Sequence, residues 1–276
     1  FVETTVKGGV RDTLYMIQDN GASEWADSSS ENRFLYSMGG ELATSLMRDF
    51  NFNGDEVHSW SHMARPFVNY TYTSIPDKVI LPQFDSIDAL KDENIIRYGV
   101  NNFFKIYGER NNNEFDRDYA YLKISQGYDL RSEVSDTPLT PVEFQTGFYP
   151  VQSIRIKYLT DLDMYGNGLY YHSIETDYIS NRGDVVGVDY RYNSITDVNS
   201  ISGSIWYLLP YNLAAGYSLE RAFDVGTLEE RIRLLYQPAC WSVEFSSHYT
   251  PGDQTYMLTF RLANIGSPFG FDLPGF

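Results

Sequence analysis

Apolar and polar residues alternate along most of the chain, so that successive side chains belong to two different faces. In the segment DVVGVDYRY, from residue 186 onward, the even positions hold Val or Tyr and the odd positions hold Gly, Asp or Arg. The segments SIRIKYL, TYMLTFRLA and CWSVEFSSHY repeat this arrangement. A period of two indicates β-strands that have one apolar face and one polar face.

The pattern predicts about fifteen strands and little helix. They are expected at residues 1–8, 10–18, 33–48, 59–73, 95–108, 118–128, 141–149, 151–161, 168–180, 184–193, 199–208, 211–221, 226–236, 239–249 and 254–264. Many have ten residues or more, which is longer than most strands of soluble proteins. About ten tilted residues is the length that a strand needs to cross a bilayer.

The connections between these strands fall into two classes that largely alternate. The short ones contain KGGV, FNGDEV, YP, SNRGD, LPYN or QP, and the long polar ones contain DNGASEWADSSSEN, SIPDKVILPQFDSIDALKDEN or RSEVSDTPLT. Short turns on one rim and long loops on the other are typical of an outer-membrane barrel. The segment GERNNNEFDRD breaks this alternation. It predicts a long connection at a place where the alternation requires a short turn.

An all-β, antiparallel transmembrane β-barrel is therefore the expected fold. A soluble β-sandwich also alternates, but it turns its apolar face inward, and fifteen long strands would make a large stack. In a barrel the apolar residues face lipid and the charged ones face a wet lumen. The candidate lumen-facing residues are Arg155, Lys157, Asp189, Arg191, Arg231 and Arg233.

Composition narrows the functional classes. The net charge of −16 argues against nucleic acid as a partner, since phosphate binding needs a basic surface. The 23 Tyr, 17 Phe and 4 Trp suit surfaces that are apolar on one side and wet on the other. The sequence has no run of about 18 apolar residues, so no transmembrane helix is predicted.

The sequence contains no arrangement of residues that is typical of an enzyme active site. It predicts no catalytic residue, no metal site and no cofactor. The sequence has no nucleophile elbow, phosphate loop or Cys/His metal pattern. His58 and His62 would share a strand face, but they would be far apart for chelation. His172 and Glu175 would lie on opposite faces, which does not support an acid–base pair.

The single cysteine, Cys240, lies just past an expected tight turn at Gln237-Pro238. One interpretation is a buried free thiol that behaves as a small hydrophobic residue. The other is a thiol whose partner lies outside these 276 residues.

Three segments resemble the LptD family of outer-membrane lipopolysaccharide-assembly proteins, also called OstA or Imp. They are the hairpin YQPACWSVEFSSHY with its last strand RLANIGSPFG, the segment HMARPFVNYTYTSIPDKVILPQFDS, and the hairpin PVEFQTGFYPVQSIRIKYLTDLD. Together they span most of residues 59–276, and the first two expected strands match only in style.

The resemblance implies that residues 1–276 form the later part of a barrel of roughly two dozen strands. The periplasmic jelly-roll and first barrel strands of the family would precede this chain. The implied function is a translocon that places lipopolysaccharide in the outer leaflet without covalent chemistry, with loops on the cell surface. The implied partners are lipopolysaccharide, membrane lipids, an LptE-type lipoprotein plug and an LptA-type periplasmic bridge protein.

The resemblance also implies a role for Cys240. In the family, the cysteine at this turn forms a disulfide with a cysteine near the N-terminal domain, and the oxidising periplasm lets such a bond persist. Counting strands back from a periplasmic C-terminus puts this turn on the periplasmic rim. The odd strand count predicts that this chain alone does not close a barrel. A porin-like channel and a soluble all-β binding or hydrolytic domain stay open as alternatives.

Overall fold

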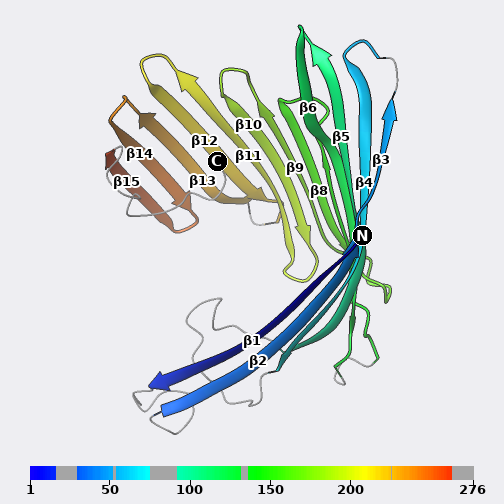
Figure 1. The fold of residues 1–276 in the computed structure, drawn as a ribbon. Coiled ribbons are helices and arrows are strands. Elements are labelled where there is room, and N and C mark those ends of the chain that lie inside the picture. Colours follow the sequence, from blue (N-terminus) through cyan, green and yellow to red (C-terminus); the bar gives the residue numbers. More distant parts are fainter. Residues whose placement is uncertain (17–29, 52–53, 75–91, 132–135, 225, 263–276) are drawn as a thin grey trace. The chain divides into compact units, whose positions relative to one another are not determined.

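The structure, a computed structural model, describes residues 1–16, 30–51, 54–74, 92–131, 136–224 and 226–262 (Figure 1). Within these ranges it contains no helix long and apolar enough to cross a membrane. The strands are β1 (Val2–Met16), β2 (Ser30–Thr44), β3 (Leu46–Asn51), β4 (Val57–Ser74), β5 (Glu93–Arg110), β6 (Asn113–Asp129), β7 (Val142–Phe148), β8 (Ile154–Leu162), β9 (Leu169–Ile179), β10 (Val185–Asn193), β11 (Val198–Leu209), β12 (Leu213–Ala222), β13 (Gly226–Tyr236), β14 (Trp241–Thr250) and β15 (Asp253–Leu262).

These strands form one sheet of 15 strands, and every pairing whose register is described is antiparallel. Each strand pairs with the next one along the chain, except that β2 and β3 both pair with β4. The prediction of an all-β, antiparallel fold is therefore confirmed. The chain divides into two units, residues 1–144 with 161–168 and residues 145–160 with 169–276, which are described separately below.

Two expected connections were wrong. The KGGV segment is not a turn, because Gly8 and Gly9 lie inside β1 and pair with Met38 and Ser37 of β2. Pairing along the whole length of β2 outweighs the local turn preference of two glycines. The GERNNNEFDRD segment is not a long loop, because only Asn111 and Asn112 separate β5 from β6. Both have positive φ, 54° and 63°, as a two-residue type I′ hairpin turn requires.

The expected strand 33–48 is interrupted, and Pro66 of β4 explains the interruption. Ala43 of β2 pairs with Phe67, and Leu46 of β3 pairs with Ala64, so the register does not change across the gap. The break in pairing with β4 lies opposite Arg65 and Pro66, and Pro66 has no N–H to donate to the ladder. Thus β2 and β3 occupy one position, and the described strands fill fourteen positions in the sheet. An odd number of strands was one reason to expect that this chain alone does not close a barrel, and fourteen positions no longer support that reason. That the chain does not close a barrel stays a prediction.

The described strands keep their apolar side chains exposed on one face. Val6 in the first unit is 81% exposed and Leu258 in the second is 72% exposed. No large side chain of the described residues is less than 2% exposed. A β-sandwich would bury this face against a second sheet, whereas a membrane barrel leaves it to lipid. The distribution of apolar residues in each unit is therefore that of a membrane-facing sheet.

Candidate functional site

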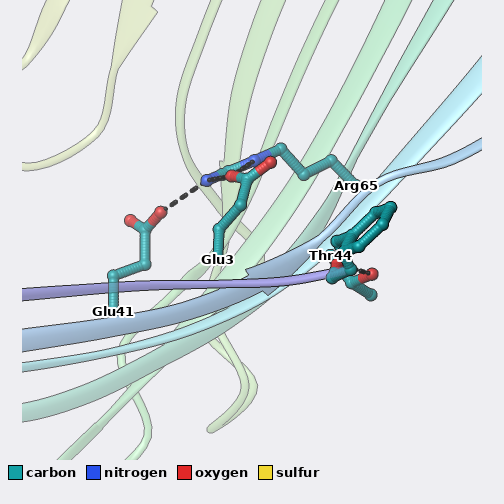
Figure 2. Close-up of polar contacts among 5 residues, drawn as sticks. Glu3, Glu41, Thr44 and Arg65 are labelled. Carbon is teal, nitrogen blue, oxygen red and sulfur yellow. Dashed lines mark hydrogen bonds and ion pairs between the residues drawn. The ribbon is translucent and has the colours of Figure 1, made fainter.

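The polar face of the first unit carries an ion-pair cluster that joins three strands (Figure 2). The Arg65 Nη2 of β4 lies 2.8 Å from Glu41 Oε1 of β2 and 2.9 Å from Glu3 Oε2 of β1. Beside this cluster, Thr44 Oγ1 donates a hydrogen bond of 2.7 Å to the Phe1 carbonyl. Without the guanidinium the two carboxylates would repel each other, so Arg65 stabilises the alignment of β1, β2 and β4.

A hollow of about 480 Å³ lies next to this cluster on the first three positions of the sheet. Its lining includes Lys7, Gly9, Gly39, Asn69 and Thr71. Lys7 pairs with Gly39, and Gly9 pairs with Ser37, so glycines leave this part of the polar face without large side chains. An ammonium group surrounded by hydroxyl and amide groups can bind sugar hydroxyls and phosphates.

Neither the Arg65 cluster nor the hollow was predicted from the sequence. Reading Gly8-Gly9 as a turn separated Lys7 from the second half of its own strand. Arg65 could have been found from alternation, because it shares its face with Asn69, Thr71 and Thr73. Its contacts with Glu3 and Glu41 could not have been predicted in this way. These carboxylates belong to other strands, and only the strand register brings them to Arg65.

The second unit has a polar face that contains all six candidate lumen residues. The strand registers place Asp189 beside Glu175 and Ser202, Arg191 beside Ser173 and Ser200, and Arg231 and Arg233 beside Ser218 and Gly216. Arg155 and Lys157 reach the same face through ion pairs with Asp177 (3.2 Å) and Glu175 (3.3 Å). That this face lines a lumen stays a prediction.

Neighbouring side chains contact most of these charged groups. Ser202 Oγ donates a hydrogen bond of 3.2 Å to Asp189 Oδ2, and Arg231 Nη2 lies 2.6 Å from Glu229 Oε1. The Arg233 guanidinium lies 5.1 Å from the centre of the Trp206 ring, which suits a cation–π contact. The face is therefore polar and charged, yet largely paired.

The turn between β9 and β10 is held by one carboxylate. Asp184 accepts hydrogen bonds from the Leu208 amide at 2.8 Å and from Arg182 Nε and Ser180 Oγ at 2.9 and 3.0 Å. The Leu208 amide, and then Arg182 and Ser180, hold the pKa of Asp184 below its ordinary value. This turn is thereby fixed to the neighbouring strand β11.

Cys240 lies in the turn itself, a small correction to its expected place. Tyr236 of β13 pairs with Val243 of β14, and Ala239-Cys240 forms the tip of the hairpin, with Gln237-Pro238 before it. Among the described residues the thiol is exposed and unpaired. The interpretation of Cys240 as a buried packing residue is therefore wrong.

The histidines do not form a metal site in the part of the chain that the structure describes, where no group of three or more His, Cys, Asp or Glu residues could hold an ion. His62 Nε2 instead makes a 2.9 Å hydrogen bond with Asn102 Oδ1. His172 pairs with Tyr192, and Glu175 pairs with Asp189, so the two lie on opposite faces of β9 as expected.

The family model LptD, described as LPS transport system D, matches residues 2–222. The match includes the first strand, where the resemblance was weakest, and ends before the Cys240 hairpin, where it was most specific. Two engineered variants of the porin of Rhodopseudomonas blastica are 11% identical, with TM-scores of 0.40, over 94% of this chain and 98% of theirs. No curated protein sequence matches the chain.

Proposed function

The chain belongs to the LptD family of LPS transport proteins, and on this premise we propose that it forms part of the outer-membrane translocon that delivers lipopolysaccharide to the outer leaflet. The family consists of outer-membrane β-barrel proteins, which agrees with the long antiparallel strands. The chain would provide a path through the membrane, while the energy for transport would come from elsewhere.

One observation carries this proposal: the same strands have an exposed apolar face and a charged, ion-paired face. In β10 the exposed Val186 and Val188 alternate with Asp189 and Arg191. Lipopolysaccharide has acyl chains and a charged sugar part. The polar face would contact the sugar part while the acyl chains stay near hydrocarbon. Neither part would then have to move into an environment of opposite polarity, which costs free energy.

The hollow beside Arg65 supports this path. Lys7 provides a cation, and Asn69, Thr71 and Thr73 provide hydrogen-bonding groups, on a stretch that Gly9 and Gly39 leave open. Sugar hydroxyls and phosphates need this combination of groups. The ion pairs of Arg65 would keep β1, β2 and β4 aligned while the substrate passes.

The partners of the translocon follow from the same premise. We propose that an LptE-type lipoprotein occupies the lumen and that an LptA-type bridge protein delivers lipopolysaccharide from the periplasmic side. The exposed Cys240 would be oxidised to a cysteine outside these residues, and the bond would hold a periplasmic domain at the rim.

Site-specific photocrosslinking in the full-length protein in cells tests the proposal. A photoreactive amino acid at Thr71, on the polar face, should crosslink to lipopolysaccharide only while transport is active. The matched position Val68 lies on the exposed apolar face of the same strand, where it should contact outer-leaflet lipid whether or not transport proceeds. Crosslinks at Val68 alone, together with ion conductance, would favour the porin-like alternative.

A further inference from the structure

An open groove of about 470 Å³ lies on the apolar face of the second unit, across the neighbouring strands β10, β11 and β12 (Figure 1). Gly203 of β11 pairs with Val188 on one side and with Leu219 on the other, and all three line the groove. A Cβ atom at Gly203 would meet nothing within 4 Å, so the missing side chain opens the groove between its two neighbours. The walls also include Val186, Ile205 and Tyr217.

Aromatic rings lie on the same face at both ends of this groove. At one end the rings of Tyr190 and Phe223 meet edge to face, with 6.3 Å between their centres. At the other end Tyr178 and Tyr207 are 48% and 43% exposed. Aromatic bands of this kind lie at the two membrane–water interfaces of outer-membrane barrels. The groove therefore follows the apolar band between them, where acyl chains lie beside the strands.

Arg221 of β12 is one of the lining residues, at the end of the groove that Tyr190 marks. Arg221 pairs with Ile201, which pairs with Tyr190 in turn, so the three residues share the apolar face. The register between β12 and β13 shifts between Glu220 and Arg221, and such bulges change the direction of a side chain. The exposed Arg221 thus places a cation where the apolar band ends.

No described residue compensates the charge of Arg221. Within the described ranges its guanidinium forms no ion pair, hydrogen bond or ring contact. Glu220 precedes it in the strand and therefore belongs to the opposite face. Glu230 shares the face of Arg221, but it pairs with Leu219 and interacts with the Tyr217 hydroxyl. An exposed guanidinium at the membrane surface favours a phosphate group supplied from outside the chain.

We propose that this groove binds lipid A, the acylated and phosphorylated part of lipopolysaccharide. One acyl chain lies over Gly203, between Val188 and Leu219, and a phosphate contacts Arg221. The end of β12 that carries Arg221 is the one away from the Cys240 turn, because β12 begins beside the end of β13. With the Cys240 turn on the periplasmic rim, Arg221 faces the leaflet that receives lipopolysaccharide.

The inference rests on the proposed function for this orientation, but the groove is separate from the proposed transport path. The path follows the polar face, whereas the groove lies on the opposite face of the same strands. The groove would therefore hold lipopolysaccharide that has already reached the outer leaflet.

Native mass spectrometry of the full-length protein, released from nanodiscs that contain lipid A and dephosphorylated lipid A, tests the proposal. The wild type should retain lipid A in preference to the dephosphorylated form. Arg221→Gln should lower this preference about fivefold, as the loss of one cation near the membrane surface would cause. Arg48→Gln is the matched control, because Arg48 is also exposed but lies on β3 of the first unit, outside the groove.

A second pair of variants tests the groove itself while Arg221 remains. Gly203→Leu should fill the groove and reduce the amount of retained lipid A. Gly8→Leu is its control, because a Cβ at Gly8 of β1 also meets nothing within 4 Å. Electrophoresis with and without heating verifies that each variant is folded. The proposal is overturned if Arg221→Gln or Gly203→Leu retains lipid A as the wild type does, if either control loses as much, or if phosphatidylglycerol is retained as well as lipid A.

The transport proposal has a separate readout in the crosslink from position 71. This crosslink to lipopolysaccharide should be unchanged in Arg221→Gln, and its loss would assign Arg221 to the transport path in place of a separate site. Its absence in the wild type would contradict transport, while the lipid A preference of the groove could still be measured.

Discussion

Arg65 of β4 and Glu41 of β2 form a 2.8 Å ion pair on the polar face, and the same guanidinium also contacts Glu3 of β1 (Figure 2). One side chain thereby links three strands that are separated by up to 62 residues in the sequence. The side chain of Arg65 is 26% exposed, so solvent weakens the interaction without removing it.

Replacing Arg65 should loosen the first strands of the sheet. Arg65→Gln leaves Glu3 and Glu41 without their shared cation, and we expect the free energy of unfolding to fall by about 1 kcal/mol after allowance for solvent screening. Lys105→Gln is the matched control, because its 3.7 Å pair with Asp118 is longer and more exposed. Denaturant titration in detergent micelles measures both. Equal effects would mean that Arg65 acts only as one more surface charge.

A charged residue on the exposed apolar face of β10 should destabilise the protein. Val188 is 49% exposed and pairs with Gly203, and an arginine there would place a cation in hydrocarbon. Val188→Arg should destabilise the protein by about 2–4 kcal/mol if the residue lies near the midplane of the bilayer. Ser202→Arg, on the polar face of the neighbouring strand, should be nearly neutral. Folding into lipid vesicles at increasing urea compares the stability of the two variants. A large loss of stability for Ser202→Arg alone would show that the polar and apolar faces are assigned the wrong way round.

Two glycines should differ sharply in their tolerance of a methyl group. A Cβ at Gly99 would collide with the Ile124 carbonyl and come within 3.0 Å of the Phe67 ring, whereas a Cβ at Gly203 would meet nothing within 4 Å. Gly99→Ala should therefore cost about 1–3 kcal/mol through overpacking, and Gly203→Ala should cost little. The midpoints of thermal unfolding test this, and similar midpoints would show that β5 can shift to accept the methyl group.

The turn that Asp184 holds should weaken in acid. Its pKa is lowered in the folded state, so its stabilising contribution is complete above the pKa of the unfolded chain and is lost as the pH falls through the folded pKa. Hydrogen exchange at the Leu208 amide should be constant from pH 7 to 5, after correction for intrinsic rates, and protection should fall below about pH 4. Asp184→Asn should remove this dependence, while Asp197→Asn in the next loop should retain it.

Cys240 should carry a disulfide in the full-length protein. Its exposed position at a hairpin tip allows a second chain segment to approach within the few ångströms that an S–S bond requires. Non-reducing electrophoresis should show a mobility change on reduction for the wild type and none for Cys240→Ser. The variant should impair assembly or transport more than barrel folding. Wild-type mobility that is insensitive to reduction would leave Cys240 without this role.

The sequence predicted strands best where alternation is uninterrupted. β10 was expected at 184–193 and spans Val185–Asn193, because Val186 to Tyr192 alternate without exception. The prediction failed where a local signal opposed the pairing with another strand, as at Gly8-Gly9, or where a missing N–H broke a ladder, as opposite Pro66. The Arg65 cluster depends on registers between strands, and no single strand contains that information.

The order of the strands has a consequence for how the protein assembles. With the exception of β3, every strand pairs with its immediate predecessor along the chain, and short turns such as Asn111-Asn112 and Ala239-Cys240 connect many of them. Contacts between near neighbours in sequence need little loop-closure entropy, and such topologies fold faster than those with distant pairings. Hairpins could therefore add one after another to a growing edge, so that each new strand covers the edge that the last one exposed.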